Sequence, residues 1–198
     1  MFVTFEGLDG SGKTTQAELL RAHLEAAGRD VVATREPGGT ELGEKVRDLL
    51  LGGTEISPWA EAGLFAAARA ELVSEVIGPA LESGADVVCD RYLDSSLAYQ
   101  GIARGLGVDR VLALNIDAMR GILPDVTFLL LVDPEEAARR AGSASDRIER
   151  EGPDFLSAVD KAYRELGSIF AARIVMLDGS RPPDEIAKEV RDKLPGLS

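Results

Sequence analysis

The residues best suited to chemistry form one glycine-rich run near the start of the chain, GLDGSGKT at positions 7–14. The run fits G-x-x-x-x-G-K-[ST], with an apolar, β-prone segment at 2–6 before it and helical apolar spacing at 15–27 after it. A strand, a glycine loop and a helix start in this order form a phosphate-binding loop, or P-loop. Glycines let backbone N–H groups surround phosphate oxygens, and the helix amino terminus adds a favourable dipole. The sequence therefore predicts a site for a nucleoside triphosphate.

Two side chains of this run have predicted roles. We expect Lys13 to reach the β- and γ-phosphates and the Thr14 hydroxyl to bind Mg²⁺. The alternative is a glycine-rich turn that fits the pattern by chance, and the setting between strand and helix disfavours it. The predicted ATP-binding residues are Gly7, Leu8, Asp9, Gly10, Ser11, Gly12, Lys13, Thr14 and Thr15.

Composition limits the class of protein. At 198 residues the chain is long enough for one domain with a full core. A formal net charge of −12 argues against a nucleic-acid surface, which needs clustered Lys and Arg, but a few arginines can still hold a small anion. No apolar run reaches the roughly 20 residues of a membrane span, and no signal peptide precedes the first predicted strand. The one cysteine, Cys89, excludes an internal disulfide, so we expect a cytoplasmic protein without membrane or nucleic-acid partners.

The order of apolar segments predicts the fold. Short β-prone runs at 2–6, 31–34, 87–89, 126–132 and 174–177 alternate with helical segments. The run at 126–132 is apolar almost throughout, which is typical of a parallel strand covered on both faces. We therefore expect a single α/β domain over residues 1–198, a doubly wound five-stranded parallel sheet with helices on both faces. The expected helices are 15–27, 41–51, 58–83, 94–102, 108–122, 134–141, 155–172 and 183–194.

Charged residues follow two of the predicted strands. Asp90 ends the run at 87–89, where a carboxylate can organise Mg²⁺, and Arg91 beside it can bridge the phosphates of donor and acceptor. Arg35 follows the run at 31–34, within TREPGGT. Ligands of such sheets bind at the carboxyl ends of strands, where the P-loop also lies. These residues therefore belong to the same predicted site.

A segment at about 139–152 breaks the alternation. It places four arginines, Arg139, Arg140, Arg147 and Arg150, among small residues. A solvated charged loop is one explanation. Because phosphoryl transfer needs positive charge on an element that closes over the nucleotide, we favour a mobile lid.

With these motifs the chain resembles the thymidylate kinases, in the bacterial-type branch of the P-loop nucleoside monophosphate kinases. The resemblance covers nearly the whole chain and lies in segments 7–14, 35–40, 64–69, 90–101, 124–127 and 146–149. It implies the P-loop NTPase fold, transfer of the γ-phosphate of ATP to dTMP with Mg²⁺, and a homodimer. The P-loop has Gly10 where the other branch has an arginine, and in this branch the lid supplies the arginines.

The resemblance also implies a pocket for the acceptor nucleotide. Phe65 would stack on thymine, and Arg69, four residues later on the same helical face, would donate to a thymine carbonyl. Spacing alone favours a core position for Phe65. Ser96, Tyr99 and Gln100 would line the base and sugar, with Tyr99 blocking a ribose 2′-hydroxyl; helix packing is their alternative role.

The remaining implied roles concern the phosphates. Asp9 would accept from the deoxyribose 3′-hydroxyl, and Arg35 and Arg91 would hold the dTMP phosphate. Arg147 would arrive with the lid and neutralise the transferring group, a role that Gly10 cannot fill. The predicted catalytic residues are Lys13, Arg91, Arg147 and Asp9, and the predicted Mg²⁺ ligands are Thr14 and Asp90.

Two other functions fit some of these features. Another deoxynucleotide or nucleoside kinase of the same fold would need few changed residues. A nucleotide-dependent switch ATPase would also carry a P-loop, but the Asn-Lys-x-Asp of a guanine-specific switch does not occur.

Overall fold

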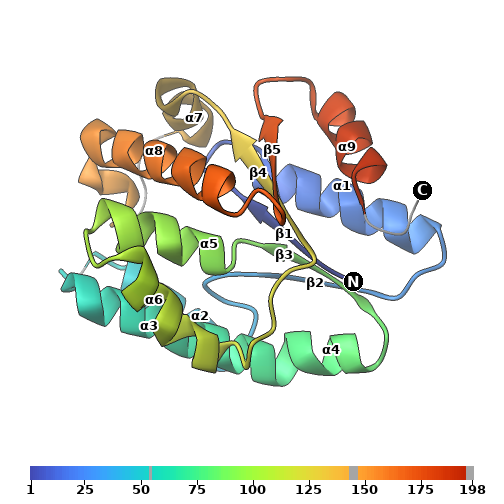
Figure 1. The fold of residues 1–198 in the computed structure, drawn as a ribbon, viewed down its shortest axis with the longest axis horizontal. Helices are drawn as coiled ribbons and strands as arrows, with labels where there is room; N and C mark the ends of the chain where they lie inside the picture. Colours follow the sequence, from blue (N-terminus) through green and yellow to red (C-terminus); the bar gives the residue numbers. More distant parts are fainter. Residues whose placement is uncertain (54, 143–146, 195–198) are drawn as a thin grey trace.

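The computed structural model describes residues 1–53, 55–142 and 147–194, and Figure 1 shows its fold. Five strands form one sheet in which all neighbours are parallel, in the order β2-β3-β1-β4-β5. This arrangement confirms the predicted doubly wound α/β fold. The strands are Phe2–Glu6 (β1), Val31–Arg35 (β2), Asp86–Asp90 (β3), Val126–Leu131 (β4) and Ile174–Asp178 (β5).

Helices alternate with these strands along the chain. Within the described ranges they are Lys13–Ala26 (α1), Glu41–Leu51 (α2), Pro58–Leu72 (α3), Gly78–Glu82 (α4), Leu93–Ser96 (α5), Val108–Ala118 (α6), Pro134–Ala141 (α7), Pro153–Ile169 (α8) and Pro183–Asp192 (α9). Two π-helical segments, Val73–Ile77 (η1) and Leu97–Ala103 (η2), continue α3 and α5, and one 3-10 turn, Glu149–Glu151 (η3), precedes α8. No described helix is both long enough and apolar enough to cross a membrane.

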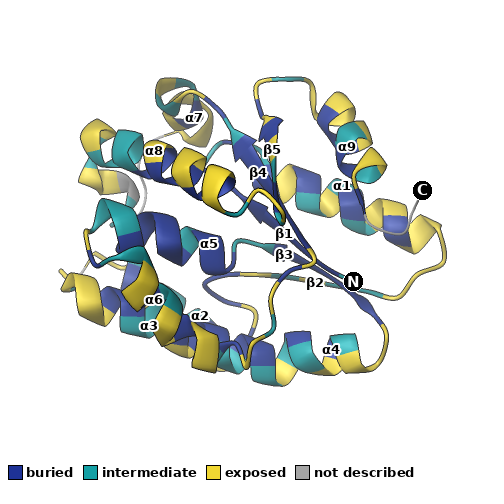
Figure 2. Ribbon diagram, in the orientation of Figure 1, coloured by how far each residue is buried: buried dark blue, intermediate teal, exposed yellow. Residues whose placement is uncertain are grey.

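Helices cover both faces of the sheet (Figure 1). Helices α1 and α9 pack on one face, where Leu20, Leu24 and Ile186 meet Val3 and Phe5 of β1. The other face is covered by α3, the α5–η2 segment and α8. The three central strands, β3, β1 and β4, are buried along almost their whole length, whereas the edge strands β2 and β5 are partly exposed (Figure 2).

Side chains alternate between the two faces of the sheet along β1. This alternation decides which residues face the layer formed by α3, α5–η2 and α8. Val3 and Phe5 point to α1 and α9, so Phe2, Thr4 and Glu6 point to the opposite face. Phe2 joins the apolar cluster there, and its ring packs edge-on against another aromatic ring, that of Tyr92. The pleat therefore sends a carboxylate, Glu6, into a buried layer.

Side chains cap two of the helices, α2 and α7. The Thr40 hydroxyl accepts from the Gly43 N–H (2.9 Å) at the start of α2, and Asp133 Oδ1 accepts from the Glu135 N–H (2.9 Å) at the start of α7. Predicted helices 41–51 and 134–141 coincide with α2 and α7. The predicted strands agree within one residue at each end, whereas the helix predicted at 108–122 ends earlier, at Ala118.

Candidate active site

The P-loop and the ends of β2 and β3 meet at one edge of the sheet. Strand β3 pairs in parallel with both β1 and β2, so Glu6, Arg35 and Asp90 end neighbouring strands at that edge. Helix α1 begins there at Lys13, after Gly12 with φ of 96°, a left-handed conformation that glycine adopts without steric cost. The segments predicted to share a site are thus adjacent.

A cavity of about 430 Å³, which we call the phosphate cavity, lies at this edge. Its charged lining residues are five cations, Lys13, Arg35, Arg47, Arg91 and Arg140, and three acids, Asp9, Glu36 and Asp90. This local excess of positive charge suits a polyanion, although the whole chain is acidic. Of the predicted ATP-binding residues, Asp9, Gly10, Gly12, Lys13, Thr14 and Thr15 line this cavity, Ser11 lines a neighbouring one, and Gly7 and Leu8 are buried.

Lys13, Asp9 and Arg91 form a chain of charges at the P-loop. Lys13 Nζ donates to the Leu8 carbonyl (2.8 Å) and lies 3.4 Å from Asp9 Oδ1, which accepts from Arg91 Nη2 at 2.7 Å. Burial lowers the pKa of the Lys13 ammonium to about 8. The Arg91 guanidinium holds the pKa of Asp9 well below its usual range, so Asp9 is an anion at neutral pH.

The two predicted metal ligands are in contact. The Thr14 hydroxyl donates to Asp90 Oδ2 at 2.5 Å, and both residues line the phosphate cavity. A hydroxyl and a carboxylate are hard oxygen ligands, and Mg²⁺ takes few protein ligands when phosphate oxygens and water complete its shell. This pair of side chains fits Mg²⁺ held together with a triphosphate.

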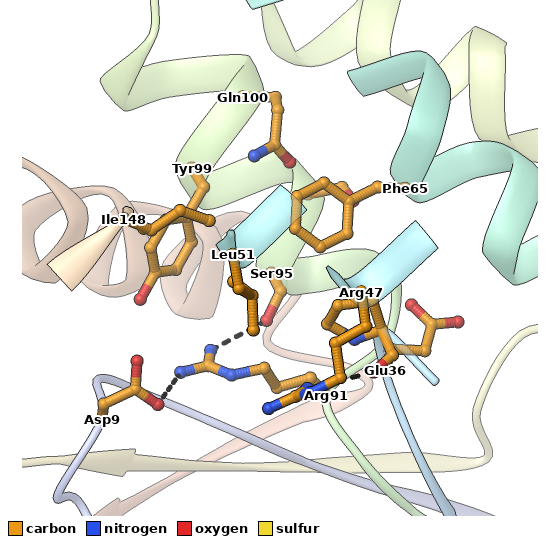
Figure 3. Close-up of a pocket in the computed structure, with 12 residues that line it drawn as sticks. Asp9, Glu36, Arg47, Leu51, Phe65, Arg91, Ser95, Tyr99, Gln100 and Ile148 are labelled. Atoms are coloured by element: carbon orange, nitrogen blue, oxygen red, sulfur yellow. Dashed lines mark hydrogen bonds and ion pairs between the residues drawn. The ribbon is translucent and has the colours of Figure 1, made fainter. Parts of the chain in front are cut away.

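A second cavity of about 230 Å³, which we call the acceptor cavity, opens beside the first. In Figure 3 the rings of Phe65 and Tyr99 flank it, with Gln100 toward one end and Asp9 and Arg91 toward the other. The two cavities share Asp9, Glu36, Arg47 and Arg91. The acceptor cavity is lined by Asp9, Glu36, Pro37, Arg47, Leu51, Phe65, Arg91, Ser95, Ser96, Tyr99, Gln100 and Ile148.

Tyr99 and Gln100 are held from behind the cavity. The Tyr99 ring packs edge-on against the rings of Phe155 and Tyr163, with centroids 6.2 Å apart in each case. Burial raises the pKa of Tyr99 to about 12, so its hydroxyl is neutral. Gln100 Nε2 donates to Glu61 Oε1 at 2.8 Å, which fixes the amide with its oxygen as the remaining acceptor.

Arg69 does not occupy the position predicted for it. Its side chain is 1% exposed and is not among the described residues that line the acceptor cavity. The guanidinium pairs with both carboxylate oxygens of Glu36 (2.5 to 3.1 Å) and also donates to Ser96 Oγ at 3.1 Å. Because Glu36 and Ser96 both line the cavity, Arg69 lies behind its wall rather than inside it.

Arg147 also lies away from the predicted place. Its guanidinium forms an ion pair with Glu61 of α3 and donates to the Leu50 carbonyl at 3.0 Å. Burial alone would raise the pKa of Glu61, but hydrogen bonds from Gln100, Arg147 and Arg104 lower it, so the pair is charged. Arg147 thus pairs with the carboxylate that also holds Gln100 of the acceptor cavity, and it is not among the described residues that line the phosphate cavity.

The other predicted lid residues fall into three groups. Arg140, on α7, lines the phosphate cavity and donates to the Gly179 carbonyl at 2.9 Å. Arg139 is exposed and pairs with Glu136 at 2.7 Å, and Arg150 is exposed too. Residues 143–146, which include part of the motif at 146–149, lie outside the described residues.

Two features were not predicted. Arg47, on α2, lines both cavities and donates to the Pro37 carbonyl at 3.0 Å; no motif marks it, although α2 follows TREPGGT directly. A third cavity, of about 360 Å³, shares Gly12, Thr15 and Arg140 with the phosphate cavity. It also includes residues 179–183, which follow β5. Only knowledge of the strand order could have predicted that these residues lie beside the P-loop.

Comparison with known proteins gives a consistent result. The family model described as thymidylate kinase matches residues 5–190. A thymidylate kinase from Thermoanaerobacter sp. (strain X514) is 47% identical, over 96% of this chain and 95% of that one. Another, from Bifidobacterium longum (strain DJO10A), is 47% identical over 100% and 98% of the two chains.

A solved structure agrees with these relatives. The crystal structure of thymidylate kinase from Ehrlichia chaffeensis superposes with a TM-score of 0.80 at 34% identity. The match covers 96% of this chain and 95% of that chain. The shared fold, the paired cavities and the full-length similarity lead to one conclusion: the chain belongs to the thymidylate kinase family.

Proposed function

We propose that the two joined cavities hold ATP and dTMP with their phosphates facing each other across Arg91. As a thymidylate kinase, the chain transfers the γ-phosphate of ATP to dTMP and releases ADP and dTDP. The observation that carries the proposed geometry is the set of residues common to both cavities, above all Arg91 and Arg47. A guanidinium shared by two phosphate sites can align both groups and neutralise charge as it moves between them.

The donor nucleotide occupies the phosphate cavity and its neighbour. Lys13 and the P-loop N–H groups hold the β- and γ-phosphates, and the nucleoside extends into the third cavity, which shares Gly12 and Thr15 with the first. Thr14 and Asp90 hold Mg²⁺, which neutralises phosphate charge when it is bound. These roles follow from the position of each residue around one polyanion site.

The acceptor nucleotide occupies the second cavity. Phe65 stacks on thymine, Asp9 accepts from the 3′-hydroxyl, and the Tyr99 ring fills the space beside the sugar where a 2′-hydroxyl would lie. Glu61 accepts one of the two hydrogens of the Gln100 amide nitrogen and so fixes the amide, and the Gln100 oxygen is the group that accepts the N3–H of thymine. Cytosine has no hydrogen on N3, and two acceptors would face each other. This hydrogen bond therefore favours dTMP over dCMP.

Phosphoryl transfer needs no protein base in this arrangement, because the dTMP phosphate is an anionic nucleophile with a second pKa of about 6. Arg91, with Arg35 and Arg47 nearby, orients it toward the γ-phosphate. Residues 139–152 act as a lid, and Arg140 is the lid cation that faces the phosphates in this conformation. Arg147 reaches them only if closure releases it from Glu61.

A homodimer is part of this proposal. Helix α3 packs against both α2 and α6, and all three helices carry exposed large apolar side chains. These side chains are Leu42, Leu49, Trp59, Leu114 and Ile116. Sedimentation at micromolar concentration tests this, since a monomeric mass would exclude a stable dimer. The cytoplasm, where ATP and dTMP meet, is the proposed location.

One variant tests the assigned chemistry. Lys13→Ala should abolish phosphoryl transfer while leaving the fold intact, because the lysine binds phosphate and contributes no apolar packing. The measurement is ADP release with ATP, Mg²⁺ and dTMP, together with a circular dichroism spectrum of the variant. Near-normal turnover in a folded Lys13→Ala protein would show that the P-loop is not the donor site.

A further inference from the structure

Glu6 is a buried acid to which the proposed reaction assigns no role. It is the last residue of β1 and is fully buried between the sheet and the layer formed by α5, η2 and α8. Its Oε1 accepts from the backbone N–H groups of Tyr92 (2.8 Å) and Ser95 (3.1 Å). Its Oε2 accepts from the Ser95 hydroxyl (2.6 Å) and the Tyr163 hydroxyl (3.0 Å). Three of these donors belong to the segment that follows Arg91, and the fourth lies on α8.

The same two hydroxyls also bind Arg91. Arg91 Nη1 donates to Ser95 Oγ and to Tyr163 Oη, at 3.1 Å in both cases. Each hydroxyl has one hydrogen, and a carboxylate is a stronger acceptor than a second hydroxyl. With both hydrogens directed to Glu6, both oxygens turn lone pairs toward the guanidinium. The ionised carboxylate therefore sets the direction in which these two hydroxyl oxygens accept from Arg91.

We propose that Glu6 is the positioning residue for Arg91: through Ser95 and Tyr163 it holds the guanidinium in the orientation that phosphoryl transfer requires. The proposal rests on the phosphate-bridging role given to Arg91 above. It goes beyond that role because Glu6 lines neither of the two cavities among their described residues. It assigns Arg91 two supports, Asp9 on Nη2 and the Glu6 network on Nη1.

The backbone supports the same conclusion. Arg91 has φ of 70°, a left-handed conformation that residues with a side chain adopt only where their surroundings hold it. The Arg91 N–H donates to the Phe5 carbonyl at 2.9 Å, and the next N–H, of Tyr92, donates to Glu6. The end of β1 thus fixes both the strained backbone of Arg91 and the far end of its side chain.

The charges around Glu6 make this support sensitive to pH. Burial, followed by the nearby carboxylate of Asp94 on α5, raises the pKa of Glu6 to about 7, against the opposing effect of Arg91. Asp94 is itself paired with Arg173, which follows α8, at 2.7 Å. The other charged or titratable groups that act on Glu6 are Lys13 of α1, Arg69 of α3, Cys89 of β3, Tyr99 of η2 and Tyr163 of α8.

Protonation would reverse the network. A protonated Glu6 becomes a donor toward Ser95 or Tyr163, and the hydroxyl that accepts from Glu6 then directs its own hydrogen elsewhere, to the other hydroxyl at 3.0 Å or toward Arg91. The ionised form, and with it the oriented guanidinium, is present above pH 7 and is lost as the pH falls through that value. Gln in place of Glu6 imitates the protonated form, because its amide nitrogen donates at one of the two positions.

The test compares wild type with Glu6→Gln over a pH series. The ratio of wild-type to variant kcat should be at least about tenfold at pH 8.5, since misplaced catalytic groups cost up to about 10²-fold, and should shrink toward one near pH 5.5. A ratio cancels the titration of dTMP itself. Glu25→Gln, an exposed change of the same kind on α1, should give a ratio near one throughout. A Glu6→Gln ratio of one, or a ratio that does not change with pH, would overturn the proposal.

A second variant covers the case in which Glu6→Gln does not fold. Tyr163→Phe removes one acceptor of Arg91 and leaves the carboxylate, and it should lower kcat at least about threefold at pH 8.5. Unchanged kcat in both Tyr163→Phe and Ser95→Ala would also overturn the proposal. Arg91→Ala separates this result from the function of the site: if that variant retains full activity, the bridging role itself is wrong.

Discussion

Gly10 is the point at which the P-loop contacts helix α7, and this close contact predicts the effect of a larger residue at position 10. A Cβ atom built on Gly10 would lie 2.1 Å from the Ala137 carbonyl oxygen and 2.9 Å from the Ala141 N–H nitrogen. Non-bonded carbon and oxygen atoms need at least about 1 Å more than the shorter of these distances. Gly10→Ala must therefore push α7 away from the P-loop or distort the loop.

The size of the effect follows from two contributions. Gly10 has φ of 80°, and an alanine in that left-handed region costs roughly 1–2 kcal/mol. Overpacking against rigid backbone adds about 1–3 kcal/mol. Gly28, at the end of α1, is a matched control, because its φ is 78° and a Cβ atom added there would meet nothing within 4 Å. Gly28→Ala therefore measures the conformational cost alone.

Urea unfolding of both variants gives the comparison. We expect Gly10→Ala to be less stable than Gly28→Ala by about 1–3 kcal/mol, or roughly 2–12 °C in melting temperature for a chain of this size. Only Gly10→Ala should also lose kcat, by about tenfold or more, because the displaced helix carries Arg140. Equal stability of the two variants with unchanged kcat would refute the contact and the docking of α7 against the P-loop.

Three further predictions concern the cavities. Phe65→Ala should raise the KM for dTMP about tenfold, the cost of a lost aromatic stack, while the KM for ATP stays within about threefold; similar changes in both constants would place Phe65 outside the base site. Arg140→Ala should lower kcat about 10²-fold, whereas Arg147→Ala should mainly raise the KM for dTMP. Steady-state kinetics measures both constants, and the reverse pattern would restore the catalytic role predicted for Arg147. Thr14→Ala should raise the Mg²⁺ concentration for half-maximal rate at least about tenfold, and an unchanged Mg²⁺ titration would exclude Thr14 as a ligand.

Local signals explain how much of the fold could be predicted. The P-loop pattern marks the end of β1 and the start of α1, and the helical spacing of apolar residues predicts α2 and α7. The π-helical segment Leu97–Ala103 could not be predicted, because one extra residue per turn leaves no clear trace in the spacing of apolar residues. Tyr99 and Gln100 lie on this segment; the resemblance implied their place at the acceptor cavity, but the spacing gave no sign of their partners Phe155, Tyr163 and Glu61.

The structure brings together the predicted site residues that lie next to a motif, whereas distant partners hold others elsewhere, and the chemical roles of all of them stay predictions. Asp9, Lys13, Thr14 and Asp90 lie at the ends of β1 and β3, where parallel strands bring motifs together. The guanidinium of Arg147, in contrast, pairs with Glu61, a residue 86 positions away.

Arg69 shows the same limit. Its partner Glu36 is 33 positions away and Asn115 is 46 positions away, and neither belongs to a pattern that the sequence displays. A side chain on the predicted helical face can turn either to a ligand or to a buried carboxylate, and Arg69 turns to the carboxylate of Glu36. Spacing along a helix predicts which residues are neighbours, not which of them meets the substrate.

The most direct test of the assigned function is an acceptor panel. ADP release is measured with ATP and Mg²⁺ and, in turn, dTMP, dCMP, dGMP or dAMP, and kcat/KM is compared. We expect dTMP to be preferred by at least about 10²-fold, because the other bases leave a buried polar group of the acceptor cavity unpaired. A purine monophosphate as the best acceptor, or ADP release that does not depend on any acceptor, would contradict the account.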